Sequence, residues 1–81
     1  MTRARGVWRA ATIIGALPPD TAWVLTATHD ESVVLNIYAP PAEWDTMART
    51  LKLGEVHDRL AGQYLTFQWG TLTVSFEKEQ P

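Results

Sequence analysis

Apolar and polar residues alternate along two stretches near the C-terminal end of the chain, over residues 64–69 and 72–77. A period of two is typical of strands with one buried face. Gly70-Thr71 lies between the stretches and suits a two-residue turn with glycine first. The pattern therefore predicts a β-hairpin with a single register. Its three inward pairs are Trp69 with Leu72, Phe67 with Val74, and Leu65 with Phe76.

A second hairpin is predicted upstream, over residues 23–28 and 33–38, where the same alternation recurs on both sides of His29-Asp30-Glu31. Polar residues of this kind favour a turn between two strands. The register that keeps the more apolar set on one face pairs Trp23 with Ile37, Leu25 with Leu35, and Ala27 with Val33.

A helix is predicted over residues 41–53. Its buried stripe follows the helical spacing i, i+3, i+4, i+7, with Trp44, Met47, Ala48 and Leu51. Proline is tolerated in a first helical turn, and the acidic residues near the start complement the helix dipole. Asp45 and Arg49 form an i, i+4 pair, and Gly54 is the expected residue just beyond the C-terminus.

The first fourteen residues are ambiguous. Residues 1–6 are basic and polar, which favours a mobile tail. Residues 7–14 alternate as a strand would, although their alanine content would also allow a helix. The β-branched run Thr12-Ile13-Ile14 favours the strand. A further short strand is expected from Val56 to Leu60.

These elements predict an α+β fold in the order β-β-β-α-β-β-β, with the first strand uncertain. The antiparallel sheet has five or six strands, and one helix (about 41–53) packs on one face. The other face is semi-polar, because its positions mix apolar, aromatic and hydroxyl side chains. The residues expected there are Val24, Thr26, Val34, Asn36, Tyr38, Tyr64, Thr66, Gln68, Thr71 and Thr73.

Composition narrows the class of protein. With 81 residues, 46% of them hydrophobic, the chain is one small globular domain spanning 1–81. There is no cysteine, which excludes disulfides, thiol catalysis and cysteine-based metal sites. No stretch reaches the length of a membrane span, and we expect a cytoplasmic protein without membrane contact.

Candidate chemistry is sparse. His29-Asp30-Glu31 and His57-Asp58 place histidine beside carboxylates, a combination that can bind a cation. The spacing lacks any zinc pattern, however, and such residues are ordinary in turns. No nucleophile elbow, phosphate-binding loop or dinucleotide motif is present. We therefore expect a non-enzymatic protein with no catalytic residues, no metal and no cofactor.

Nucleic-acid binding is the alternative function. Arg3, Arg5 and Arg9 concentrate positive charge near the N-terminus, and Trp8 offers one stacking ring. Against this, the net charge is −2, so the chain lacks the general attraction that nucleic-acid binding requires. A weak single-stranded nucleic-acid binder that uses this arm is the second hypothesis.

Protein–protein contact is the function that the sequence favours. A small size, spare aromatic residues and a semi-apolar sheet face suit a binding or regulatory protein, and a homodimer would cover more of that face. The size and composition are typical of the small accessory proteins that phages and mobile elements encode. Trp23, Trp44 and Trp69 are expected in the core. The expected interface consists of Trp8, Val24, Val34, Tyr38 and Tyr64.

Overall fold

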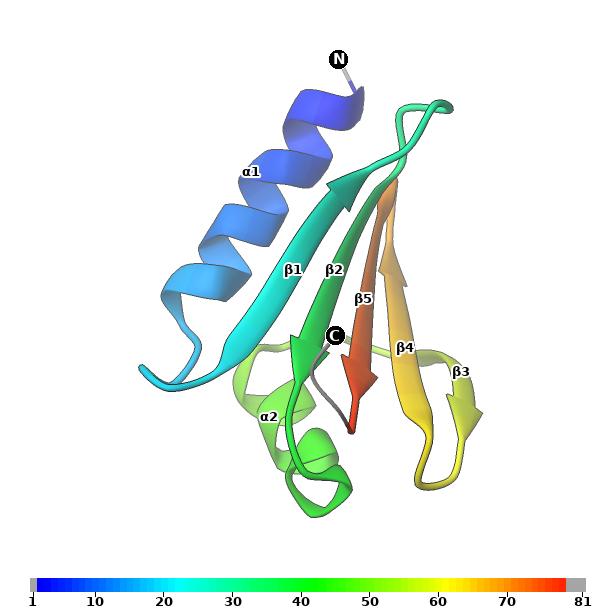
Figure 1. The fold of residues 1–81 in the computed structure, drawn as a ribbon. Coiled ribbons are helices and arrows are strands. Elements are labelled where there is room, and N and C mark those ends of the chain that lie inside the picture. Colours follow the sequence, from blue (N-terminus) through cyan, green and yellow to red (C-terminus); the bar gives the residue numbers. More distant parts are fainter. Residues whose placement is uncertain (1, 79–81) are drawn as a thin grey trace.

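The computed structural model describes residues 2–78, with side chains from Arg5 onward, and has an α+β fold (Figure 1). The predicted fold class is therefore confirmed, although the sheet is mixed and a second helix is present. The helices are α1 (Thr2–Gly15), the one-turn η1 (Pro41–Glu43) and α2 (Trp44–Thr50). The strands are β1 (Ala22–Ala27), β2 (Val33–Tyr38), β3 (Val56–Leu60), β4 (Tyr64–Trp69) and β5 (Leu72–Glu77).

The five strands lie in the order β1-β2-β5-β4-β3. Both predicted hairpins are confirmed in register: Trp23 pairs with Ile37 in the first, and Phe67 pairs with Val74 in the second. Gly70 has a φ of 62°, as the first position of the predicted turn requires. The sheet is mostly antiparallel, as predicted, and differs at one pair, because β5 pairs with β2 in parallel. The chain crosses between these strands through α2, β3 and β4, and such a long connection permits parallel pairing.

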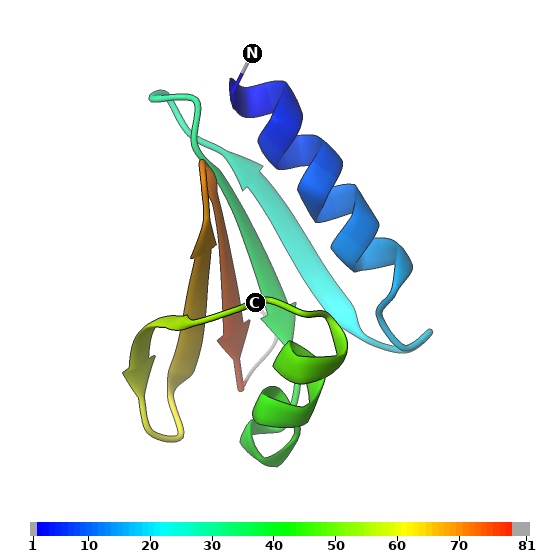
Figure 2. The same ribbon diagram turned by 180° about the vertical axis from the view of Figure 1, so that it is seen from behind.

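The two α-helices, α1 and α2, cover the same face of the sheet. They lie behind the strands in Figure 1 and in front of them in Figure 2. The core fills the space between, with central strand residues such as Leu35, Leu65 and Phe76 fully buried. Phe67 and Phe76 meet edge to face, with ring centroids 6.1 Å apart. No helix of residues 2–78 lies on the opposite face of the sheet, which we call the open face.

The N-terminal segment is a helix, so the strand predicted over 7–14 is wrong. Residues 2–6, expected to form a tail, begin the same helix; Met1 lies outside the described residues. Gly6, Ala10 and Ile13 are buried at the i, i+4, i+7 spacing of one helical face. Contact with the sheet therefore decides the conformation, and it outweighs the weak β preference of the isoleucines.

The predicted helix over 41–53 is confirmed in place but is shorter. Its first turn is η1, and α2 ends at Thr50. Lys52, not Gly54, ends it in the left-handed conformation, with a φ of 56°. The Leu53 N–H donates to the Ala48 carbonyl at 3.1 Å, and the Lys52 N–H donates to Arg49, which together form a Schellman cap.

Candidate functional site

The open face is the candidate site, because it is the broad surface that the two helices leave uncovered. Alternate residues of each strand point to it, so the register places Val24, Val34, Tyr38 and Tyr64 on it. Val24 is 37% exposed, and the other three are half-buried. These are four of the five predicted interface residues.

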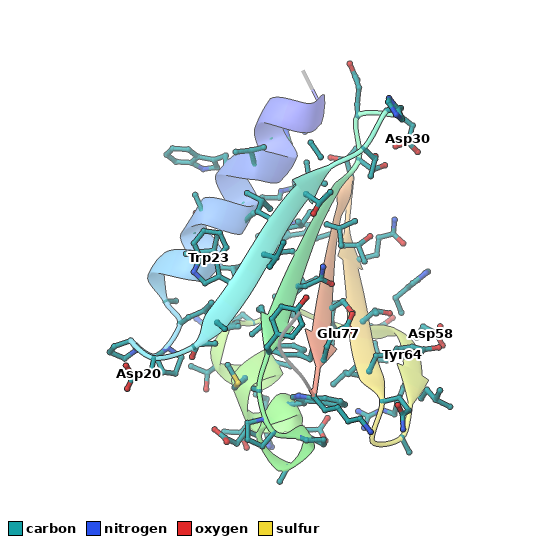
Figure 3. All side chains as sticks on the ribbon, viewed as in Figure 1. Asp20, Trp23, Asp30, Asp58, Tyr64 and Glu77 are labelled. Carbon is teal, nitrogen blue, oxygen red and sulfur yellow. The ribbon has the colours of Figure 1, made fainter. Side chains whose placement is uncertain are left out.

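Polar side chains connect the strands on this face. The Tyr64 hydroxyl donates to Asp58 Oδ2 at 3.0 Å, and Figure 3 shows the two side chains together on β4 and β3. This donated hydrogen bond, with the Asp58 charge, raises the pKa of the Tyr64 hydroxyl above its ordinary value. Ser75, which is 6% exposed, donates to Glu77 Oε2 at 3.1 Å. These bonds hold both carboxylates in place on the open face.

One row of this face combines rings and charge. Tyr38 and Tyr64 pair with Glu77 from opposite sides of β5, so the carboxylate lies between two aromatic residues. Asp58 adds a second negative charge on β3. The strand residues on this face include no lysine or arginine among the described side chains. A surface with this chemistry is complementary to a partner that presents a cation beside apolar side chains.

Sequence reasoning missed Asp58 and Glu77 as members of this surface. The signal for Glu77 was available, since extending the predicted C-terminal hairpin by one pair places it opposite Tyr64. The position of Asp58 was harder to predict from the sequence. The β3–β4 register shifts between Val56 and Asp58, and such a bulge changes which residues share a face.

Trp8, the fifth predicted interface residue, lies in the other layer. It is on α1 and is 74% exposed, on the side of the sheet that carries the helices. The structure therefore does not bring Trp8 together with the other four residues. Of the three tryptophans expected in the core, Trp44 is buried at 4% exposure, whereas Trp23 and Trp69 are each 44% exposed, so that expectation is wrong for both.

Of the three arginines of the nucleic-acid hypothesis, the structure describes the side chains of Arg5 and Arg9, and Arg9 is engaged within the fold. Arg9 lies over the Trp69 ring, 4.6 Å from its centroid, and its Nη1 donates to the Trp69 carbonyl at 3.1 Å. This contact joins α1 to the turn between β4 and β5. Arg5 is exposed, and the side chain of Arg3 lies outside the described residues.

The two histidines lie far apart in the topology. His29 is in the turn between β1 and β2, and His57 is in β3 at the opposite edge. Within residues 2–78, no group of three or more histidine or acidic side chains is placed to hold a metal ion. Two grooves flank α2, one of about 330 Å³ beside Leu17 and one of about 470 Å³ beside Val56. Neither of these two is lined by a histidine.

No helix in the described part of the chain is long and apolar enough to cross a membrane. Comparison with protein-family models, with curated proteins and with solved structures finds no match to this chain.

Proposed function

We propose that this chain is a non-enzymatic binding or regulatory protein that docks on a partner protein through the open face of its sheet. The observation that carries the proposal is the one-sided placement of the helices. Both pack on one face, and the other presents Val24, Val34, Tyr38 and Tyr64. Aromatic residues dominate the energetics of protein interfaces, and a partner bound to this broad face would be blocked from its other ligands.

The partner is a protein surface with a lysine or arginine near apolar side chains. Two features support this chemistry: the carboxylate of Glu77 between two tyrosines, and the absence of lysine or arginine among the described strand residues of the open face. A cation between these rings would gain both charge attraction and cation–π contact. We expect association to weaken as salt increases.

The experiment compares two variants that add the same charge to opposite layers. Val34→Lys places a lysine on the open face, on β2 between Thr26 and Thr73, and Thr12→Lys changes an exposed position of α1. Each tagged variant and the wild type are used to capture partners from the cells that make the protein, with nucleic acid and protein both analysed. Circular dichroism checks that each variant is folded.

We expect Val34→Lys to reduce capture of the wild-type partner about tenfold or more, because a buried like charge is strongly unfavourable at an interface. Thr12→Lys should retain the partner. Equal capture by both variants, or loss in both, would overturn the assignment to the open face. Recovery of nucleic acid that is released by salt would instead favour the alternative hypothesis.

A further inference from the structure

The two edges of the sheet differ in how well they resist pairing with another strand. At one edge, β3 carries His57, Asp58 and Arg59, and its register is interrupted by a bulge. Charges and bulges of this kind discourage a further strand from pairing. At the other edge, β1 is AWVLTA, six residues without charge or proline, and its register with β2 is continuous. β1 therefore lacks the protection that β3 has.

The outward-pointing backbone groups of β1 follow from the hydrogen bonds on its inner side. The Thr28 N–H donates to the Ser32 carbonyl at 2.8 Å, so even-numbered residues of β1 direct their backbone groups toward β2. The Val33 N–H, on the far side of β2, donates to Thr71, as the same alternation requires. The N–H and C=O groups of Trp23, Leu25 and Ala27 consequently point away from the sheet, where no described strand pairs with them.

Apolar side chains lie on both faces at this edge. Trp23 is 44% exposed on the face that carries the helices, and Figure 3 shows it between β1 and α1. Val24 is 37% exposed on the open face. Two effects would stabilise pairing of such an uncharged strand with another strand: its backbone hydrogen bonds and the burial of apolar side chains on both faces.

We infer that β1 pairs in antiparallel fashion with β1 of a second copy of this chain, so that two five-stranded sheets join into one. A two-fold axis at Leu25 sets Leu25 against the second copy's Leu25, and sets Trp23 against its Ala27. Every backbone group left free on the three outward residues then has a partner. This register also sets residues of the same face opposite each other, since Val24 meets the second copy's Thr26 on the open face.

A register centred one residue earlier would satisfy fewer of the outward backbone groups. It is centred on Val24 and would require the Thr21 N–H, which already donates to Pro18 at 3.1 Å. The register centred on Leu25 has no such conflict. A second copy suits the site because a two-fold contact is self-complementary and because β1 places no charge at the junction.

The first half of α1 leaves room for this pairing, whereas its second half lies along the outer side of β1 (Figures 1 and 2). The ideal Cβ of Gly6 would lie 3.1 Å from Val33 Cγ2, and Arg9 bonds to the carbonyl of Trp69. These contacts place the first half of α1 over β2 and the β4–β5 turn, inward from β1. In the dimer the two α1 helices would lie on one face of the joined sheet, with both Trp23 side chains near the junction.

The size of the contact predicts its strength. Six strand residues span roughly 20 Å, and a sheet with one helix layer is roughly 20 Å deep, so each copy would bury on the order of 400 Å². A standard stable interface buries about 800 Å² per partner. We therefore expect a weak dimer that forms as concentration rises. This dimer does not depend on the open face binding a partner.

The test compares matched substitutions at the two edges. Trp23→Lys and Val56→Lys each place a lysine at an edge residue of similar exposure, 44% and 45%. Sedimentation equilibrium is measured from about 5 to about 500 µM, the range in which so small an interface dissociates. We expect the wild type and Val56→Lys to dimerise alike, and Trp23→Lys to weaken the dimer about tenfold or more.

Two further measurements keep the test decisive if Trp23→Lys fails to fold. Ala27→Pro removes one outward N–H and leaves the β1–β2 bonds intact, and it should also weaken the dimer. In the wild type, amide hydrogen exchange at Leu25 should slow as concentration rises, whereas exchange in β3 should not. A wild type that stays monomeric throughout, a dimer that Ala27→Pro leaves unchanged, or protection that appears in β3 instead would overturn the inference.

Discussion

At the residue scale, Asp45 forms its ion pair with a residue of a different element and not with its neighbour in the helix. The helical spacing predicts an ion pair with Arg49, one turn along α2. Instead, Arg59 of β3 donates from Nη2 to Asp45 Oδ1 at 2.8 Å. This hydrogen bond, more than the attraction of either arginine's charge, lowers the pKa of Asp45 below its ordinary value. Both side chains are largely exposed, so the pair contributes little to stability, and that small contribution depends on pH.

We expect Arg59→Gln to raise the pKa of Asp45 toward its ordinary value. Because the folded-state pKa is lowered, the pair stabilises the fold above the unfolded-state pKa. That contribution is lost as the pH falls through the lowered value. An NMR titration of the carboxyl carbons measures the change. Asp30 is the internal control, since Thr28 and Ser32 lower its pKa by hydrogen bonds that Arg59 does not touch. An unchanged Asp45 titration would contradict the assigned cause.

At the element scale, α1 is held close to the sheet by a small residue. An ideal Cβ at Gly6 would lie 3.1 Å from both Thr71 Oγ1 and Val33 Cγ2, so any side chain there requires these neighbours or the helix to shift, and a larger side chain requires a larger shift. Ala10, one turn later, is fully buried. The first half of the helix therefore depends on small side chains at its contact face, whereas Ile13 supplies a larger buried side chain in the second half.

We expect Gly6→Leu to destabilise the protein by about 1–3 kcal/mol, the usual result of overpacking a tight contact. Gly15→Ala is the matched control, because nothing lies within 4 Å of its Cβ position. Alanine there should be neutral or stabilising by up to about 1 kcal/mol, since it favours helix more than glycine does. Urea denaturation measures both. Equal stability of the two variants would show that α1 is not packed as closely as described.

At the scale of the whole molecule, the core belongs to one face of the sheet, and the C-terminal hairpin supplies much of it. Leu65, Leu72 and Phe76 of that hairpin are fully buried. Phe67 is 3% exposed and contacts the ring of Phe76. Trp69, in the same alternating series, is 44% exposed. It lies at the turn, where the Arg9 side chain of α1 crosses its ring.

We expect Phe67→Ala to cost about 3–5 kcal/mol, as for other buried aromatic residues, which approaches the total stability of a small domain. Trp69→Ala should cost less, about 1–2 kcal/mol, since it loses the Arg9 contact and only part of a buried ring. Thermal and urea denaturation compare the two, with Phe67→Leu as a milder variant if Phe67→Ala does not fold. A larger loss for Trp69→Ala would contradict this account of the core.

The sequence by itself determined the parts of this protein that depend on near neighbours. The register of each hairpin follows from strict alternation and a short turn, so Phe67 with Val74 and Leu25 with Leu35 were predictable pairs. The membership of Val24, Val34, Tyr38 and Tyr64 in one face follows from the same alternation. The helix around Trp44 follows from its apolar spacing.

Only the tertiary structure decided what depends on contacts between distant segments. Residues 7–14 fit two periods, and they form a helix because Gly6, Ala10 and Ile13 meet the sheet. The parallel pairing of β2 with β5 joins strands that no short turn connects. The exposure of Trp23 depends on where α1 comes to lie, and Asp45 pairs with Arg59 because the fold brings α2 to β3. Local alternation has a fixed geometry, whereas each of these outcomes depends on how whole elements pack against one another.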